Sequence, residues 1–359
     1  MSQIEPAQPL QPGSTIGILG GGQLARMLAT AAARLGYETV VLDPSDPCPA
    51  AQVTNSQIVG AYDDSACLVE LADRCDVVTY EFENVPEKSA RLLSDAVALV
   101  PNVRALAISQ DRLTEKDFLG SIGLPTARYE QANSQAEAEA AVSQHAGQRA
   151  ILKARRLGYD GKGQLRVDGD LPSDAFDQLG GVPLVAEAFV DFVSEISVIV
   201  ARTADGTTRC FEPARNEHDG GILVRSTVPC GQPDEVVAAA KTAAKTLVES
   251  LDYVGVLGLE LFVLPDASLI VNEFAPRVHN SGHWTELACV TDQFEQHIRA
   301  VANLPLGDPS GRSCEMINLI GPDVDLVPDL LSAGGWRVHL YGKADVRPGR
   351  KMGHATRLL

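Results

Sequence analysis

Two glutamates in one predicted β-hairpin are the residues whose types and spacing point most directly to chemistry. Residues 256–274 predict the hairpin, and a four-residue turn would place Leu264 opposite Leu269 and Glu260 opposite Glu273. Directly opposed side chains hold their Cβ atoms about 4.5–5.5 Å apart. Two carboxylates at that separation repel, so either one is protonated or a cation lies between them. Because Mg²⁺ takes carboxylates together with substrate phosphates, we predict a Mg²⁺ site, with Mn²⁺ as a substitute. The alternative is two solvated glutamates on an exposed face.

A glycine-rich loop, GYDGKGQ at residues 158–164, is the second candidate. Its glycines let the backbone approach a ligand and leave N–H groups for phosphate oxygens. Lys153 ends the preceding strand, and Arg155, Arg156 and Lys162 add positive charge to an otherwise acidic chain. This concentration of cations favours a polyphosphate, although the spacing differs from that of the P-loop. The alternative is an ordinary hairpin loop with solvated basic side chains.

Two polar segments follow the hairpin. In NEFAPRVHNSGHW, residues 272–284, the polar groups predict a substrate loop. A zinc pair of His279 and His283 is the weaker alternative, because Asn-Ser-Gly between them is poor helix and no third ligand is apparent. Near the C-terminus, RPGRKMGH offers Arg350, with Lys343 upstream, as a clamp for an anion, unless this stretch is a solvated tail.

The elements that must position these residues begin with alternating strand-like and helix-like runs over residues 15–100. This alternation predicts a parallel sheet with right-handed crossovers. Gly20, Gly22 and Ala25 fit G-x-G-x-x-A, and Asp43 closes the next apolar run. Taken alone, that stretch would indicate an NAD site.

The rest of the chain is richer in strands. Helices are predicted to end by Gly123, two strands flank the glycine loop, and residues 234–251 predict one long helix. Boundaries are expected near residues 115 and 300, with residues 1–14 as a disordered lead-in.

Composition limits the classes of function. The chain has 359 residues and a formal net charge of −17, which disfavours nucleic acid and anionic membrane surfaces as partners. No apolar run is long enough to predict a membrane span, and no secretory signal is recognised. Seven cysteines without a C-x-x-C pair favour reduced thiols, so we expect a cytoplasmic protein.

Seven motifs in order identify a family. GGGQLARM, TYEFENVP, QDRLTEK, GYDGKGQ, GLELFV, NEFAPRVHNSGHWT and RPGRKMGH closely resemble the N5-carboxyaminoimidazole ribonucleotide synthetase family of ATP-grasp enzymes. The resemblance runs from residue 15 to the end. It implies a mixed α/β and α+β chain with a Rossmann-like N-terminal domain at 15–115, a central ATP-grasp domain at 116–300 and a small β-rich C-terminal domain at 301–359. A homodimer is also implied.

The resemblance also implies a reaction. Bicarbonate attacks the γ-phosphate of ATP to give ADP and carboxyphosphate, which breaks down to phosphate and CO₂. The exocyclic amine of 5-aminoimidazole ribonucleotide then attacks the CO₂, in a step of purine biosynthesis. The chain stops at Leu359, earlier than in many members, but the clamp residues are present and activity is expected.

Site residues are carried over position by position. The ATP site is expected to comprise Arg112, Lys153, Gly158, Tyr159, Asp160, Gly161, Lys162, Gly163, Gln164, Glu187, Ala188, Phe189, Val190, Glu195, His218, Asn272 and Glu273. The ribonucleotide site is expected to comprise Gly22, Gln23, Leu24, Glu81, Tyr159, Asp160, Lys343 and Arg350. Asp160, Lys162 and Arg277 are the expected catalytic residues, with Asp160 holding or deprotonating the amine, and Glu260 and Glu273 are the expected metal ligands. In a regular strand Asn272 would point away from the face that carries Glu273.

Three alternatives stay open at this point. The first is another ATP-grasp enzyme with a different acceptor, and the second is an NAD-dependent oxidoreductase resting on the fingerprint from Gly20 to Asp43. The third is a nucleotide-binding protein without turnover. With the family assignment, the glycine turn is expected to hold the 5′-phosphate of the ribonucleotide through free N–H groups, and Asp43 loses its predicted ribose role.

Overall fold

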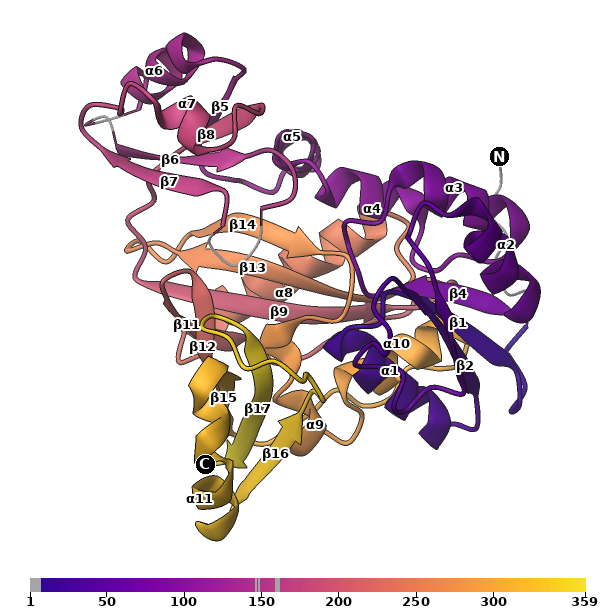
Figure 1. The fold of residues 1–359 in the computed structure, drawn as a ribbon. Helices are drawn as coiled ribbons and strands as arrows, with labels where there is room; N and C mark the ends of the chain where they lie inside the picture. Colours follow the sequence, from indigo (N-terminus) through magenta and orange to yellow (C-terminus); the bar gives the residue numbers. More distant parts are fainter. Residues whose placement is uncertain (1–7, 146, 148, 159–161) are drawn as a thin grey trace.

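The computed structural model describes residues 8–145, 147, 149–158 and 162–359. Its N-terminal part is a parallel sheet in the order β3-β2-β1-β4, as the alternation of strands and helices predicted (Figure 1). The strands are β1 (Thr15–Leu19), β2 (Glu38–Asp43), β3 (Ser56–Val59) and β4 (Val77–Tyr80), and the helices are α1 (Gln23–Arg34), α2 (Ser65–Arg74), α3 (Glu87–Ala96), α4 (Val103–Ser109) and α5 (Arg112–Ser121). The short edge strand β3 was not predicted.

A second, antiparallel sheet in the order β5-β8-β6-β7 forms the upper left of Figure 1. Its elements are β5 (Tyr129–Ala132), α6 (Gln135–Ser143), β6 (Arg149–Ala154), β7 (Gln164–Asp168), α7 (Ala175–Gln178) and β8 (Leu184–Ala188). The predicted strands on either side of the glycine loop are β6 and β7, so the prediction is confirmed. We call β5 to β8 with α6 and α7 the lid sheet.

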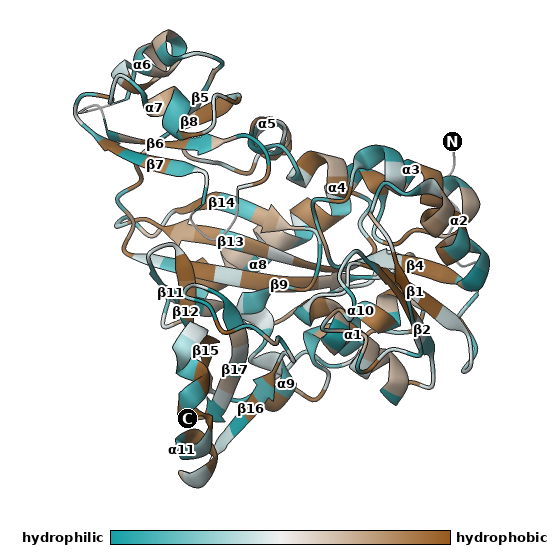
Figure 2. Ribbon diagram, viewed as in Figure 1, coloured by the Kyte–Doolittle hydropathy of each residue, from teal (hydrophilic) through white to brown (hydrophobic). Residues whose placement is uncertain are grey.

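The third sheet has nine strands and runs through the middle of the molecule in the order β14-β13-β9-β11-β12-β15-β17-β16, with β10 paired to β9. Its first members are β9 (Ser194–Arg202), β10 (Thr208–Cys210), β11 (Ala214–Asp219), β12 (Ile222–Val228), β13 (Gly255–Val263) and β14 (Leu269–Ala275). Figure 2 shows apolar residues concentrated along β9 and β13, and also along β1 and β4 of the first sheet. We call this the central sheet.

The two faces of β13 have different surroundings. Leu257, Leu259 and Leu261 are fully buried in the core that also contains the long helix α8 (Asp234–Ser250), which the sequence predicted. On the other face, Val256 belongs to the core that includes α10 (Gln293–Val301). Further along this second face lies Glu260, so α8 and α10 secure the strand while its other end presents a carboxylate.

The C-terminal strands extend the central sheet, since β12 pairs with β15. They are β15 (Cys314–Ile320), β16 (Trp336–Leu340) and β17 (Lys351–Leu358), accompanied by α9 (Thr285–Ala288) and α11 (Val327–Ser332). The strands that flank the predicted anion clamp are therefore hydrogen-bonded into the same sheet as β13 and β14. Within the described part of the chain, no helix is long and apolar enough to cross a membrane.

A β-bulge in the hairpin of β13 and β14 was not foreseen. Near the turn, Val263 rather than Leu264 lies opposite Leu269, so the predicted Leu264–Leu269 pair is wrong. The loop between the strands is one residue longer than the predicted four-residue turn, because it includes Leu264.

The bulge compensates for the longer loop. The register passes from Leu261 opposite Val271 to Glu260 opposite Glu273, which leaves Asn272 as the extra residue of β14. The predicted pairing of Glu260 with Glu273 is therefore confirmed. The residue pairs between it and the loop are shifted by one residue from the predicted register.

Candidate active site

The paired glutamates form the centre of the site on the central sheet. Asn272 Nδ2 donates to Glu260 Oε2 at 3.4 Å, and Arg112 Nη1 donates to Glu273 Oε2 at 2.7 Å. His279 Nε2 lies 3.5 Å from Glu260 Oε1. The bulge brings Asn272 to the face of the glutamates, which corrects the expectation that a regular strand would point it away.

The two glutamates differ in charge. Burial, together with the charges of Glu273 and Glu195, raises the pKa of Glu260 well above its ordinary value. Burial also opposes ionisation of Glu273, but the charges of Arg112 and Lys153 outweigh it and lower the pKa of Glu273 to about 2. Since 40% of the Glu273 side chain is exposed, the two cations decide the direction of its shift. The pair is therefore asymmetric, because its surroundings favour the ionised form of Glu273 and disfavour the ionised form of Glu260.

The lid sheet presents an opposite balance of charge. Lys153 Nζ lies 3.0 Å and Lys116 Nζ lies 3.2 Å from Glu187 Oε2. All three side chains are at least nine-tenths buried. Burial raises the pKa of Glu187, but the charges of Lys153 and Lys116 outweigh that effect and the net pKa is lowered. Burial lowers the pKa of Lys153. Two ammonium groups thus surround one carboxylate.

Helix α5 joins these two faces. Asp111 is its N-cap, accepting from the N–H groups of Leu113 and Thr114, and it also binds Arg155 from the end of β6. Glu115 Oε1 accepts a hydrogen bond of 2.7 Å from the Phe274 N–H on β14. The helix therefore contacts the lid sheet through its cap and the central sheet through Glu115.

Sequence reasoning missed Lys116 and Glu115 as members of this network. Arg112, Glu115 and Lys116 are spaced three and four residues apart in α5, and such residues lie on one helix face. That spacing in QDRLTEK was the available signal.

The described ends of the glycine loop lie beside Arg112. The Ala154 N–H donates to the Gly163 carbonyl at 2.7 Å, and a Cβ on Gly158 would lie 3.6 Å from Arg112 Nη2. Gln164 is paired with Lys153 in the sheet. The predicted residues Tyr159, Asp160 and Gly161 lie outside the described residues, and Lys162 and Gly163 follow them directly.

The predicted adenine and ribose residues lie on or directly after strands of the lid sheet and the central sheet. The N–H groups of Ala188 and Phe189 donate to the carbonyls of Arg128 and Arg149, while Val190 follows at the end of the stretch. On the central sheet, Glu195 of β9 and His218 of β11 meet, with Glu195 Oε2 3.2 Å from His218 Nδ1. The structure thus brings Glu195 and His218 together, as the sequence alone did not indicate.

The glycine turn before α1 differs from the expectation of free N–H groups. Gly21 N–H donates to Asp43 Oδ2 at 2.8 Å, and Gly22 N–H donates to Glu81 Oε1 at 2.7 Å. Tyr62 also donates to Asp43. Asp43 thus has a structural role that was not assigned, and two of the turn's amides are bound by carboxylates. Gln23 and Leu24 begin α1, whose N-cap Gly22 makes no side-chain cap.

The other predicted ribonucleotide residues come from distant segments. Arg277 Nη2 donates to Glu83 Oε1 at 2.9 Å, which connects the substrate loop to the N-terminal part. Burial raises the pKa of Glu81 to about 7, although the Gly22 N–H and the charge of Arg277 oppose it. Lys343 Nζ donates to the Lys351 carbonyl, and Arg350 Nη1 donates to the Asp345 carbonyl.

His279 and His283 do not form a metal pair. Residues Asn280–Gly282 form a 3-10 turn, and Nδ1 of His279 contacts Ser281 Oγ at 2.8 Å. His283 is bound through Nδ1 by Gln293. Burial and the charge of Arg277 lower the pKa of His279 to about 3, so a neutral imidazole lies beside Glu260.

Known proteins match the chain over almost its whole length. The ribonucleotide synthetase preATP-grasp domain matches residues 14–110, the ATP-grasp domain residues 117–294, and the phosphoribosylaminoimidazole carboxylase C-terminal domain residues 314–359. The N5-carboxyaminoimidazole ribonucleotide synthase of Brucella melitensis is 55% identical over 353 residues, 97% of each chain.

Solved structures agree with these matches. An N5-carboxyaminoimidazole ribonucleotide synthetase in complex with ADP superposes with a TM-score of 0.95 at 39% identity, covering 99% of this chain and 94% of that one. The Aspergillus clavatus synthase in complex with ADP and 5-aminoimidazole ribonucleotide has a TM-score of 0.89 at 31% identity, covering 97% and 94%.

The lid sheet, the central sheet and their charged residues, taken with these matches, define the class: the chain is an ATP-grasp enzyme, an ATP-dependent ligase. Within that class it belongs to the N5-carboxyaminoimidazole ribonucleotide synthase family. Its reaction is the ATP-dependent carboxylation of 5-aminoimidazole ribonucleotide in purine biosynthesis. The oxidoreductase alternative fails, because Asp43 is turned to the glycine turn and to Tyr62 instead of toward a ribose.

Proposed function

We propose that the polyphosphate of ATP lies between the lid sheet and the central sheet, with Mg²⁺ held by Glu260 and Glu273. The observation that carries this proposal is the opposed glutamate pair, in which burial and the charge of Glu273 disfavour ionisation of Glu260. A divalent cation would stabilise the ionised form of both carboxylates, with the Asn272 oxygen as a neighbouring donor. Mn²⁺ would serve as a substitute. A bound metal would neutralise phosphate charge and draw the β- and γ-phosphates into one geometry.

The chain's own residues would bind and neutralise the phosphates in the first stage of the reaction, the attack of bicarbonate on ATP. Lys153, Lys116 and Arg112 supply positive charge on the phosphate side. Lys162 and the N–H groups of residues 158–164 would close over the phosphates. Bicarbonate then attacks the γ-phosphate, and the enzyme contributes positioning and charge neutralisation more than covalent chemistry.

In the second stage, carboxyphosphate gives phosphate and CO₂ beside the bound ribonucleotide, whose amine attacks the CO₂. We assign Arg277 to orient the reacting anion, because it is half-buried and paired with Glu83. Asp160 would hold or deprotonate the amine, with Tyr159 beside the substrate. Closure of the loop would keep water from the labile intermediate.

The ribonucleotide would bind across three segments. Its 5′-phosphate would face the start of α1 at Gly22, Gln23 and Leu24, and Lys343 and Arg350 would clamp it from the C-terminal side. Glu81 would accept from a substrate hydroxyl or retain its bond to Gly22. An arriving phosphate must share the glycine turn with two carboxylates, so the basic clamp is needed to make the position favourable for an anion.

Further nucleotide contacts are proposed from the same resemblance. Glu187, Ala188, Phe189 and Val190 would face adenine, and Glu195 would accept from the ribose. His218 supports this by holding Glu195 in place at 3.2 Å.

The decisive experiment measures ADP release by the purified protein in bicarbonate buffer, with and without 5-aminoimidazole ribonucleotide. Release should depend on the ribonucleotide. Release that is equal in its absence would contradict the proposed coupling of the two sites. Asp160→Ala should bind ATP normally and lose carboxylation, and normal turnover in that variant would remove Asp160 from the mechanism.

Assembly, location and domain limits are proposed as well. We propose a homodimer, supported by exposed apolar side chains near the C-terminus, including Leu326 and Leu331 at 48% and 58% exposure. A cytoplasmic location is supported by seven cysteines that are all unbridged. Sedimentation would test the dimer.

The domain limits at 15–115, 116–300 and 301–359 are supported by the family matches, whose edges lie within about a dozen residues of them.

A further inference from the structure

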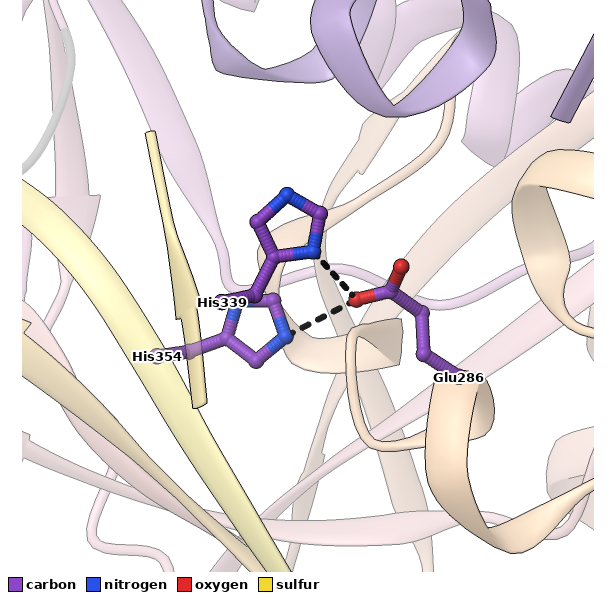
Figure 3. A group of neighbouring side chains, drawn as sticks. All are labelled: Glu286, His339 and His354. Atoms are coloured by element: carbon purple, nitrogen blue, oxygen red, sulfur yellow. Dashed lines mark hydrogen bonds and ion pairs between the residues drawn. The ribbon is translucent and has the colours of Figure 1, made fainter. Parts of the chain in front are cut away.

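Three side chains outside the nucleotide and ribonucleotide residues meet at one point (Figure 3). They are Glu286 of α9, His339 of β16 and His354 of β17. Each offers one ligand atom, and the three atoms lie within 4.8 Å of one another. Within the described residues, this is the group of histidine and carboxylate side chains that meets the geometric requirement for a metal.

The pairing of strands in the sheet brings the two histidines together. His339 lies directly opposite His354 in the antiparallel pair of β16 and β17, so both rings project from one face. Their ring centres are 5.4 Å apart. Glu286 reaches in from α9, and its Oε2 lies 3.1 Å from His339 Nδ1 and 3.0 Å from His354 Nε2.

The donor set fits a first-row transition metal. Two imidazole nitrogens and a carboxylate oxygen are common ligands of Zn²⁺, with bonds of about 2.0–2.2 Å. Around a tetrahedral ion with such bonds, neighbouring ligand atoms lie about 3.3 Å apart. The two separations of 3.1 and 3.0 Å from Glu286 Oε2 are close to that value. Mg²⁺, in contrast, prefers oxygen ligands, so the two kinds of site would select different ions.

Surrounding residues fix the orientation of these ligands. Tyr341, which is fully buried, bonds His354 Nδ1 at 2.9 Å, so that Nε2 of the same ring faces Glu286. The backbone carbonyl of Glu286 accepts from Arg337 Nη1 at 3.1 Å. Such second contacts set the ring orientation of metal-binding histidines in proteins.

A second observation points to an absent polar partner here. His283 is 1% exposed and its ring lies 4.8 Å from that of His354. Its Nε2 is buried and has no hydrogen-bond partner within the described part of the chain. Buried polar atoms are nearly always paired, so an unpaired imidazole nitrogen on a ring that contacts His354 marks a place for an ion and its water.

We propose that Glu286, His339 and His354 bind Zn²⁺ at a site separate from the glutamate pair. The ion would join α9, which follows the substrate loop, to the two strands that flank the clamp residues. Lys343 follows His339 and Arg350 precedes His354 along the chain. Zinc would therefore hold the clamp strands against the rest of the central sheet.

The test uses the full-length protein after treatment with a chelator. Mg²⁺ is then kept in excess, so that it occupies the glutamate pair and Zn²⁺ binding at that pair is not measured. Zn²⁺ is titrated against a chromophoric chelator, and Co²⁺ serves as a spectroscopic probe. We expect one equivalent of Zn²⁺ to bind and Co²⁺ to give visible absorption without the near-ultraviolet thiolate band, because the ligands are nitrogen and oxygen.

The half-exposed His339 allows the least disruptive variant. His339→Gln should weaken zinc binding at least about tenfold, whereas His145→Gln, which removes an imidazole from the lid sheet region, should leave it unchanged. Zn²⁺ should also raise the melting temperature of the wild type and of His145→Gln but not of His339→Gln. Glu286→Gln provides a second variant if the first is unstable.

Three results would overturn the proposal. They are failure of the wild type to bind Zn²⁺ under these conditions, equal affinity in His339→Gln and wild type, and a thiolate band in the Co²⁺ spectrum. The last would assign the ion to cysteines instead.

Discussion

The two faces of the proposed ATP site carry opposite imbalances of charge. At the lid sheet, Lys153 of β6 and Lys116 of the adjoining helix α5 surround the single carboxylate of Glu187, so the cluster carries an excess of positive charge. On the central sheet, Glu260 and Glu273 oppose each other, and the cation that contacts the pair is Arg112, at Glu273. Each face alone carries a charge that the other residues of that face do not compensate.

The difference supports the proposal that metal and polyphosphate lie between the two faces. A polyphosphate is attracted to the cations of the lid, and a divalent metal is attracted to the glutamates of the central sheet. Metal and phosphate together satisfy both faces, whereas either alone leaves one face unpaired. The comparison therefore predicts that changes on the central sheet affect the metal requirement and changes on the lid affect the affinity for ATP.

The largest effect is expected from Glu273→Gln. It removes the ionised member of the pair, and we expect the rate of ADP release to fall by about 10²- to 10³-fold. The Mg²⁺ concentration for half-maximal rate should rise, as measured in a magnesium titration. Glu249→Gln, on the exposed side of α8, is the matched control and should behave like the wild type. An unchanged magnesium requirement in Glu273→Gln would contradict the assignment.

The next effect concerns the lid. Lys153→Met leaves Glu187 paired with Lys116 only, and the value of kcat/KM for ATP should fall by about 10²-fold. The magnesium requirement should change much less than in Glu273→Gln, since both glutamates remain and Glu273 keeps its contact with Arg112. Lys88→Met, an exposed lysine on α3, controls for the loss of a charge. Equal changes in ATP affinity and in metal requirement would contradict the assignment of separate roles to the two faces.

A smaller effect is expected from Asn272→Ala. The bulge brings this amide to Glu260, so its removal should raise the Mg²⁺ concentration for half-maximal rate by about tenfold. Asn272→Asp keeps an oxygen at the position and should retain most of the affinity. If Asn272→Ala titrates like the wild type, the amide does not contribute to the metal site.

The smallest effect is one of stability. Burial, then the charge of Glu273, raises the pKa of Glu115 to about 8, while an unfolded glutamate has a pKa of about 4.3. Between these values the folded state holds a proton that the unfolded state lacks, so raising the pH favours unfolding. In metal-free protein, Glu115→Gln should lessen the fall in melting temperature between about pH 6 and pH 8.5 by a few degrees. Thermal denaturation at several pH values measures this, and an unchanged slope would refute the raised pKa.

The sequence was informative where neighbouring residues decide the structure. The hairpin, the long helix α8 and the strands around the glycine loop follow from local periodicity, and the pairing of Glu260 with Glu273 follows from the hairpin. The motifs carried the family, because several short patterns in order are far more specific than one.

The features that could not be predicted from the sequence depend on contacts between distant segments. Lys116 and Lys153 meet only because α5 lies against the lid sheet, and periodicity holds no record of that contact. The meeting of His339 with His354 likewise depends on the pairing of two strands joined by a long connection. The bonds of Asp43 and Glu81 to the glycine turn required the folded N-terminal sheet.

The bulge at Asn272 also determines how the hairpin can change in length during evolution. A regular ladder with a shorter loop would still pair Glu260 with Glu273, but it would turn the residue before Glu273 to the opposite face. The extra residue therefore allows two consecutive side chains to serve one face. A related chain that lost one residue from the loop should keep both glutamates and lose the amide. In an alignment, the length of this loop would then indicate how many side chains are available to the proposed metal.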